Sequence, residues 1–596
     1  MTVLEALRAT LEVNDTGTPP WVTVSRPEPE TASRLWLLRS ALVRAGAVPT
    51  SWPTFFCEME LLLACLLVAG RARELWRAAA AAIPRSDAAW LLAWMLLGAV
   101  LRTLWGIRVP GYINGHGYEQ VFQLCAFSPP GYDYHGNGSY ALFGLLFLGL
   151  PRSELSIVGI TVALSLLTIP GIYALARAGS GDRAAARWAA AAAAILPAFV
   201  FYAATEERYV PGIFFLVATL VLLGVAVRTA DRILTLAAAL LAAVTVQFQP
   251  FLFLLPVPAI LLLAGTREGR SLMRRPFFWT ALAVFGAAAA GTALQHVAHL
   301  GSGQKPASDM TLGVRTLASL TAIGPDSDTF GGNAVLDPRY SPPPFAVLAG
   351  LGIVAWLLRR GSRWWGVSIA LSWLVMTLPG LGVGPRMNMV RLELPGQPFF
   401  VLAIGGGVAA LERWIERWTP RIPRLPAFLG SAVLLGAVWN WPGPIPSLFT
   451  PQRERRFIAD NVTRVPDGCT ILVPPIPRRL VTQLPIYLSA EAGLAHSWLR
   501  AVNPAEARGP AGPCLVYYRP ADCYDLTFWS PAPEEGTAEG RRAECAAFER
   551  GLALDPIVTG TIPALPDCGQ DFRTAPLEIG FFRVLSVRPD PEPDGR

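Results

Sequence analysis

Polar residues that stand directly beside long apolar segments are the first candidates for chemistry in this sequence. His116 and Glu119 lie one helical turn apart, just after an apolar segment that ends near Trp105. Asp133 follows in a stretch rich in proline, glycine and tyrosine. A carboxylate at a membrane surface can serve as general base for a hydroxyl acceptor. The alternative interpretation is that these side chains only order a loop through hydrogen bonds.

The same residues raise the question of a metal ion. His116 and Glu119, like His296 and His299, have the spacing of two ligands on one face of a helix. Two-residue matches are weak signals of a metal site. The sequence therefore predicts no certain cofactor and leaves a divalent metal ion as an alternative.

Two short polar segments further along the chain also adjoin apolar blocks. Glu206 stands two residues before Arg208, and Arg386 and Arg391 belong to a later segment. Glu206 and Glu207, which precede Arg208, are either solvated charges or part of a site shared with Glu119. Arg386 and Arg391 fall where the distribution of arginines assigns the outer face, and arginine is unexpected there. Because guanidinium groups match phosphate oxygens, this pattern indicates phosphate binding.

The composition shows which class of protein must position these residues. Only 16% of the 596 residues are charged and 53% are hydrophobic, whereas roughly a quarter of the residues in soluble proteins are charged. The mean hydropathy is +0.40. The apolar excess lies in blocks between Thr54 and Trp441. This excludes a disordered chain, a fibre and a large soluble enzyme.

The blocks predict a helical membrane protein with eleven or twelve spans, since a span requires about 17–25 mostly apolar residues. The first block contains Glu58 and Glu60 and is alternatively an interfacial helix. Leu142–Leu150 is too short to cross and suits a helix lying in the interface. The candidate spans are 54–70, 88–105, 155–178, 186–204, 210–228, 233–248, 250–264, 277–295, 344–358, 364–382, 396–411 and 426–443.

The basic residues indicate the orientation of these spans. The net charge of +7 comes from 50 basic residues of which only Lys305 is a lysine, and many form short runs between alternate apolar blocks. Short arginine-rich connections are retained in the cytoplasm. No basic stripe interleaved with aromatic residues appears, which argues against a nucleic-acid partner. The loops 106–154 and 296–343 and the C-terminal tail then face outward. High alanine and arginine with almost no lysine are typical of a GC-rich bacterial genome, so the expected location is the bacterial inner membrane.

The chain divides on this basis into three parts. A polar N-terminal segment covers 1–53, a transmembrane domain 54–443 and an extracytoplasmic α/β domain 444–596. In the last part, we expect strands at Cys469–Val473, Cys514–Tyr518 and Ile579–Val584, and helices at Glu454–Asn461 and Arg541–Gly551.

The cysteines support this sidedness. All six that lie outside the first apolar block fall on the predicted outer side, where disulfides persist: Cys125, Cys469, Cys514, Cys523, Cys545 and Cys568. Cys514 and Cys523 are the first candidate pair because only a short loop joins them.

From about Ala88 to Ala410, the order of motifs resembles the GT-C membrane glycosyltransferases, in particular the protein O-mannosyltransferases and aminoarabinose-lipid A transferases. No single motif is specific, and the order and spacing carry the resemblance. The motifs are Leu101–Trp105, Ser139–Phe143, Gly149–Glu154, Tyr173–Arg177, Gly181-Asp182, Leu196-Pro197, Glu207–Tyr209, Arg391–Pro395 and Pro398-Phe399.

This resemblance implies transfer of a sugar, with inversion, from a polyprenyl-phosphate-linked donor to a glycan, lipid or protein acceptor on the outer face. It also implies an essential acid in the first outer loop. The family usually has Asp-Glu there, whereas this chain has Tyr118-Glu119. Glu119 then matches the family's second acid, with His116 or Asp133 in place of the first. The remaining implied site residues are a second carboxylate, Glu206, and the phosphate-binding Arg391, with Arg208 and Arg386 behind it.

Three other functions compete with sugar transfer. A ligase or polymerase of the O-antigen type uses similar donors, although the acid and the interfacial helix fit it less well. A transporter of lipid-linked saccharides needs polar residues through several spans, and 155–178, 186–204 and 277–295 are almost free of charge. A non-catalytic assembly subunit with a binding tail is the third.

Overall fold

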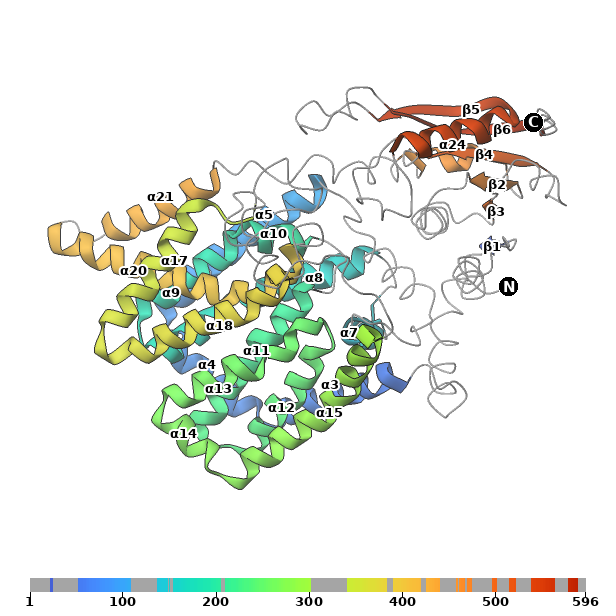
Figure 1. Ribbon diagram of the computed structural model, residues 1–596. Coiled ribbons are helices and arrows are strands. Elements are labelled where there is room, and N and C mark those ends of the chain that lie inside the picture. Colours follow the sequence, from blue (N-terminus) through green and yellow to red (C-terminus); the bar gives the residue numbers. More distant parts are fainter. Residues whose placement is uncertain are drawn as a thin grey trace. The chain divides into compact units, whose positions relative to one another are not determined.

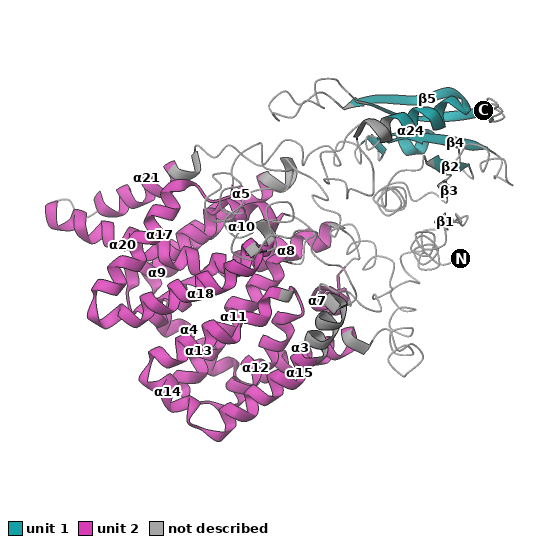
Figure 2. Cartoon of the chain, in the orientation of Figure 1, with its two compact units in different colours: residues 1–40, 109–128, 445–596 teal, residues 41–108, 129–444 magenta. Residues whose placement is uncertain are grey.

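The structure is a computed structural model, and it describes sixteen stretches of the chain. They are residues 22–24, 52–108, 137–147, 149–150, 154–204, 209–301, 340–382, 390–419, 425–439, 457–458, 460–466, 469–473, 496–500, 514–520, 538–562 and 577–587. Clustering of contacts divides the chain into two units, coloured separately in Figure 2. Unit 1 comprises 1–40, 109–128 and 445–596, and unit 2 comprises 41–108 and 129–444.

Unit 2 is a bundle of helices (Figure 1). Each of the twelve predicted spans coincides with a helix or with a pair of consecutive helices, so the prediction of a polytopic helical protein is confirmed. In chain order the helices are α3 (Trp52–Ala69), α4 (Ala72–Ala82), α5 (Arg85–Arg108), α7 (Gly138–Leu146), α8 (Glu154–Ser180), α9 (Arg183–Ile195), α10 (Pro197–Ala203), α11 (Tyr209–Thr229), α12 (Arg232–Val246), η3 (Pro250–Leu254), α13 (Pro256–Gly265), α14 (Arg267–Met273), α15 (Pro276–Gly301), α17 (Pro343–Leu358), η4 (Arg360–Ser362), α18 (Arg363–Gly382), α19 (Val390–Glu393), η5 (Leu394–Gly396), α20 (Gln397–Trp418) and α21 (Leu425–Trp439).

Not every helix is long enough to cross a bilayer alone. Among the described residues, five helices have the length and composition of a span, or seven if each bent pair counts as one. The bent pairs are α9 with α10 and η3–α13 with α14. Four further apolar helices have 10–17 residues: 232–246, 276–290, 343–358 and 425–436. α7 has nine residues, too few to cross, and seven of them are buried within the protein, so its predicted place in the interface stays a prediction.

Small residues bring the central helices of the bundle close together. α9 is an alanine helix with ten buried residues, and α20 packs against both α9 and α17. A side chain at Gly405 would collide with the backbone of Ala185, and one at Gly407 with the backbone of Leu348. In a bilayer, close packing of this kind replaces the hydrophobic driving force between helices.

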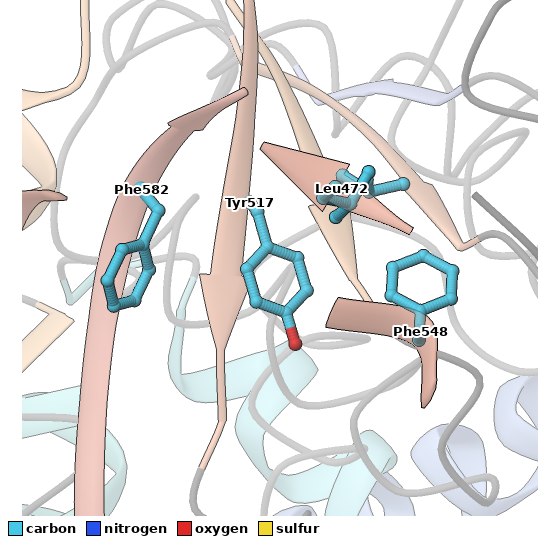
Figure 3. Close-up of a cluster of buried hydrophobic side chains, with 5 residues drawn as sticks. Leu472, Tyr517, Phe548 and Phe582 are labelled. Atoms are coloured by element: carbon cyan, nitrogen blue, oxygen red, sulfur yellow. The ribbon is translucent and has the colours of Figure 1, made fainter. Parts of the chain in front are cut away.

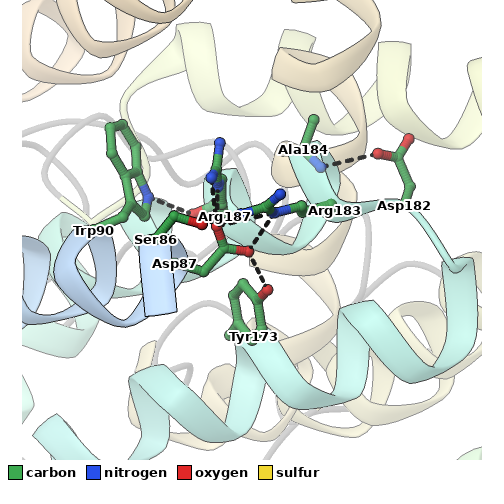
Figure 4. A network of polar contacts seen from close by, with 8 residues as sticks. All are labelled: Ser86, Asp87, Trp90, Tyr173, Asp182, Arg183, Ala184 and Arg187. Carbon is green, nitrogen blue, oxygen red and sulfur yellow. Dashed lines mark hydrogen bonds and ion pairs between the residues drawn. The ribbon is translucent and has the colours of Figure 1, made fainter. Parts of the chain in front are cut away.

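A polar network ties α5, α8 and α9 together at one end of the bundle (Figure 4). Asp87, whose side chain is completely buried, accepts hydrogen bonds from Arg183 Nε at 2.8 Å and Arg187 Nε at 2.7 Å, and also from the Tyr173 hydroxyl. Asp182 accepts from the backbone of Ala184 at the start of α9. The two arginines therefore join α9 to α5, in addition to any role in orientation, and Tyr173 joins α8 to the same carboxylate.

Replacing Asp87 by asparagine should lower the free energy of unfolding by about 2 kcal/mol, because the two arginines lose the negative charge of their acceptor and one of its two oxygens. The half-exposed Arg183 and Arg187 stay hydrated, which limits the loss. Thermal unfolding of the purified protein in nanodiscs measures the change. Glu416→Gln, at an exposed position of α20, is the control. Equal melting temperatures for wild type and Asp87→Asn would contradict this role of Asp87.

Unit 1 contains a six-stranded mixed sheet of order β1-β3-β2-β4-β6-β5, and the tail supplies every strand except β1. The prediction of an α/β tail is confirmed, and its three expected strands correspond to β2, β4 and β6. β1, β3 and β5 were not expected, and β1 comes from the N-terminal segment. The strands are β1 (Val22–Val24), β2 (Thr470–Val473), β3 (His496–Arg500), β4 (Leu515–Arg519), β5 (Leu552–Ile562) and β6 (Leu577–Val587).

In the described part of the tail, helix α24 (Ala538–Arg550) packs on this sheet. Phe548 of the helix joins Leu472, Tyr517 and Phe582 of three strands in a buried cluster (Figure 3). Arg519 of β4 donates to both carboxylate oxygens of Glu549, at 2.7 and 2.9 Å. Apolar burial and a bidentate ion pair thus fix the helix to the sheet.

The disulfide of the tail differs from the predicted one. Cys514 is bonded to Cys469, so the predicted Cys514–Cys523 pair is wrong. Thr470 of β2 pairs with Leu515 of the parallel strand β4. The residues just before them therefore lie opposite each other, with Cα atoms 4.6 Å apart. Cys545 is also disulfide-bonded, and Cys523 lies outside the described residues.

Replacing Cys469 and Cys514 together by serine should destabilise the tail by about 2–4 kcal/mol, because the bond closes a long loop in the unfolded chain. The separation of 45 residues makes that loop entropy large. Limited proteolysis of the membrane-reconstituted protein, followed with an antibody to the tail, measures the loss. Serine at Cys57 and Cys65, the free cysteines of the described residues, is the control. Equal cleavage rates would argue against the stabilising role.

Candidate functional site

Most of the predicted site residues lie outside the described part of the chain. These are His116, Glu119, Asp133, Glu206, Arg208 and Arg386. Arg391 belongs to the short helix α19, but its side chain is not among those described. The roles of all seven remain predictions, and the structure describes the helix ends from which their loops emerge.

α7 begins against the end of α12. The backbone N–H of Gly138 donates to the carbonyl of Gln247 at 2.9 Å. A Cβ at Gly138 would lie 2.7 Å from the Phe248 ring, so only glycine permits this approach. Phe248 stacks on Phe215 of α11 with ring centroids 5.0 Å apart. The consecutive helices α11 and α12 therefore meet α7, which is distant from them in the sequence, at this junction.

The junction is polar as well as buried. The side-chain oxygens of Asn137, Ser139 and Gln247 are buried, and none of the three has a hydrogen-bond partner among the described residues. Asn137 and Gln247 contribute carbonyl-type acceptors, and Ser139 contributes a hydroxyl. Buried polar atoms in native proteins nearly always have partners, and an unmet one costs about 1–3 kcal/mol. The group is therefore suited to a ligand that brings hydroxyl donors.

A second contact links this junction to the helix that carries Arg391. Gln249 follows Phe248, and its side-chain amide donates to the carbonyl of Leu392 at 3.4 Å. Glu393, the residue after Leu392, is completely buried. Gly380 of α18 packs so closely against Glu393 that a side chain at position 380 would not fit. The backbone on the C-terminal side of Arg391 is thus held between α12 and α18.

A buried arginine supports the break between α9 and α10, whose axes differ by 49°. Pro197 has no N–H, and the N–H of Ala198 donates to Tyr340 instead of continuing the helix. The carbonyls of Ala193 and Ala194 therefore lack their usual helical donors.

Arg102 of α5 supplies the missing donors. Its guanidinium is 0% exposed and donates to Ala194 O at 2.8 Å and Ala193 O at 3.4 Å. It also donates to Gly98 O at 3.0 Å and Ser165 Oγ at 2.9 Å. A positive group at a helix C-terminus is further favoured by the helix dipole. Arg102 thus stabilises the bend after which α10 leads into the segment containing Glu206 and Arg208.

The structural role of Arg102 was missed by the sequence interpretation. Two sequence features could have indicated this role: Arg102 lies late in one apolar block, and Leu196-Pro197 interrupts another. A charged residue within a span is costly unless its donors are satisfied. No sequence pattern indicates that Arg102 and the segment before Pro197 lie in contact.

The metal alternative gains no support from the described residues. Among them, no group of three or more His, Cys, Asp or Glu side chains is arranged to hold an ion. His296 and His299 lie on α15, and their side chains are not described.

Comparisons with known proteins bear on the same region. Residues 128–293 match the family described as dolichyl-phosphate-mannose-protein mannosyltransferase. No curated protein matches the chain. Among solved structures, the archaeal oligosaccharyltransferase AglB from Archaeoglobus fulgidus, in complex with an inhibitory peptide and a dolichol-phosphate, is similar at 10% identity with a TM-score of 0.43. The match covers 69% of this chain and 65% of that one, so the chain spans slightly less than two thirds of its length.

A second solved structure is ArnT from Cupriavidus metallidurans bound to undecaprenyl phosphate. It is 11% identical with a TM-score of 0.45, and the match covers 84% of this chain and 99% of that one. The family match includes the α7–α12 junction and the segment between α10 and α11. It confirms the predicted resemblance to GT-C glycosyltransferases, and residues 128–293 carry the signature of the dolichyl-phosphate-mannose-protein mannosyltransferase family.

Proposed function

We propose that this chain is an integral membrane glycosyltransferase that moves a sugar from a polyprenyl-phosphate donor to a glycan, lipid or protein acceptor outside the cytoplasm. The family match over residues 128–293 is the observation that carries the proposal. That segment contains Asp133, Glu206 and Arg208. It also contains the buried acceptors of the α7–α12 junction.

The proposed chemistry uses few side chains. Glu119 removes the proton of the acceptor hydroxyl, the oxygen attacks the anomeric carbon, and the configuration inverts. Arg391 binds the phosphate and stabilises the charge that develops on it as the lipid phosphate leaves. Asn137, Ser139 and Gln247 accept hydrogen bonds from sugar hydroxyls, which accounts for their lack of partners within the described stretches.

Two features support an orientation with the tail outside the cytoplasm of a bacterium. Arginine-rich connections lie at one end of the bundle, as cytoplasmic connections do. The Cys469–Cys514 disulfide belongs to the tail, and disulfides persist in oxidising compartments.

The pairing of β1 with β3 bears on the first helix. Val22–Val24 and His496–Arg500 form one sheet and therefore lie on the same side of the membrane. An even number of crossings must separate them. The predicted spans number twelve with α3 and eleven without it, so the strand pairing favours α3 as a crossing.

Incubation of the purified protein with a panel of polyprenyl-phosphate sugars and candidate acceptors tests the proposal. We expect release of lipid phosphate and formation of a glycosylated acceptor with at least one donor. The Glu119→Gln protein is the matched control for contaminating activity. Flipping of the lipid without cleavage of its sugar–phosphate bond would instead identify a transporter and overturn the proposal.

A further inference from the structure

A strongly basic pocket lies where α11 ends and α14 begins. Its volume is about 630 Å³, within the range of ligand pockets. The charged residues of the lining are five arginines and one glutamate, a net charge of +4 (5 − 1): Arg228, Arg267, Arg270, Arg274, Arg275 and Glu268.

The arginines of the pocket differ from others at the same end of the bundle. Arg71 pairs with Asp231, Arg183 and Arg187 pair with Asp87, and Arg413 pairs with Asp182. Within the described stretches, none of the five pocket arginines forms an ion pair. The positive-inside rule requires only that a cytoplasmic connection contains arginines. It does not explain why five arginines without ion pairs in the described stretches surround one cavity.

The walls of the pocket are held in place by contacts that leave most of these guanidinium groups available. The chain bends by 119° between α13 and α14, where Thr266 Oγ1 accepts from the N–H of Gly269 at 2.9 Å. Leu272 packs on Leu263 and Phe278 beneath the pocket. Arg270 donates to the carbonyl of Ala264 at 2.7 Å. Ala230, in the lining, adopts a left-handed φ of 51°.

Exposed tryptophans occur near the ends of two helices of the bundle, α15 and α20. Trp279, at the start of α15, is 59% exposed, and Trp414 and Trp418, near the end of α20, are 58% and 73% exposed. Tryptophan concentrates where acyl chains meet head groups. The pocket residues Arg274 and Arg275 lie within five residues of Trp279 in the sequence. This closeness to Trp279 supports a position of the two arginines near the lipid phosphates.

We propose that this pocket binds the phosphate groups of an anionic phospholipid head group, which is drawn from the leaflet at this end of the bundle. That leaflet is the cytoplasmic one in the orientation argued above. Guanidinium groups bind phosphate oxygens through paired hydrogen bonds, and basic pockets between membrane helices bind anionic head groups. A head group with two phosphodiesters matches the pocket best, because several unpaired arginines surround one cavity. The site is independent of sugar transfer.

Native mass spectrometry of the purified protein, titrated with cardiolipin or phosphatidylcholine, tests the site. The variant is Arg267→Gln with Arg274→Gln, because neither side chain forms a hydrogen bond or ion pair in the described stretches. We expect cardiolipin to bind wild type in preference to phosphatidylcholine and to bind the double variant on the order of 30-fold more weakly. Arg228→Gln alone, which changes only the end of α11, should weaken binding about fivefold.

The control is Arg360→Gln with Arg417→Gln, which removes the same charge from exposed positions outside the pocket. Equal weakening in the control and in the pocket variant would show that only overall charge matters and would overturn the site. Inorganic phosphate, titrated separately, distinguishes a lipid from a free anion. Binding of inorganic phosphate that is lost in the pocket variant, with no preference for cardiolipin, would also overturn the assignment to a lipid.

Discussion

Glu119→Gln should lower the rate of sugar transfer about a thousandfold, because glutamine cannot accept the proton of the acceptor hydroxyl. Its shape and hydrogen-bonding capacity remain close to those of glutamate, so donor binding should change little. The measurement is kcat for release of lipid phosphate with the active donor, together with KM for that donor. A fall in kcat at constant KM is the expected signature of a lost base.

Two companion variants make this result specific. Glu154→Gln, at the start of α8, removes a carboxylate from the far end of the same predicted loop and should leave kcat unchanged. Asp133→Asn tests whether the second acid of the loop takes part. Wild-type activity in the Glu119→Gln protein would exclude Glu119 as the base. Loss of activity in Asp133→Asn instead would assign the role to Asp133.

Arg102→Met should destabilise the bundle by about 3–5 kcal/mol, as expected when one partner of a buried charged network is removed. Methionine fills a similar volume but donates nothing. The carbonyls of Ala193 and Ala194 would then stay buried without donors. Thermal unfolding in nanodiscs, with the yield of folded protein, measures the effect.

Arg85→Met is the matched control, because Arg85 is an exposed arginine in the same helix. Arg102→Lys separates charge from geometry, since an ammonium cannot reproduce the planar fork of guanidinium donors. We expect the lysine variant to lie between wild type and Arg102→Met in stability. An Arg102→Met protein as stable as Arg85→Met would refute the supporting role of Arg102 at the helix break.

The helices of this protein were predictable because the signal for each is local. Whether an apolar segment such as 210–228 enters a bilayer depends on the transfer free energy of its own residues. This segment forms α11, whose two ends each lie one residue beyond the predicted ends. The strands β2, β4 and β6 were predictable for the same reason. β1, with only three residues, and β3 depend on pairing with distant strands and left no comparable local pattern.

The candidate site was predictable only as a set of residue types. The sequence pointed to acids and arginines near the ends of apolar blocks. It did not point to the buried oxygens of Asn137, Ser139 and Gln247, because uncharged polar residues at helix ends are common. Their burial follows from Gly138 meeting Phe248, a contact between segments about one hundred residues apart.

Composition and hydropathy by themselves determined that this chain is a polytopic helical membrane protein with a small α/β tail, since transfer into a bilayer depends on each segment separately. Tertiary structure alone decided which partners distant residues acquire. The register of β2 against β4 pairs Cys514 with Cys469, and packing of α5 on α9 brings Arg102 to the carbonyls beside Pro197. The bend after α13 gathers the pocket arginines. Such contacts arise from strand register and helix packing over the whole chain, which no local pattern records.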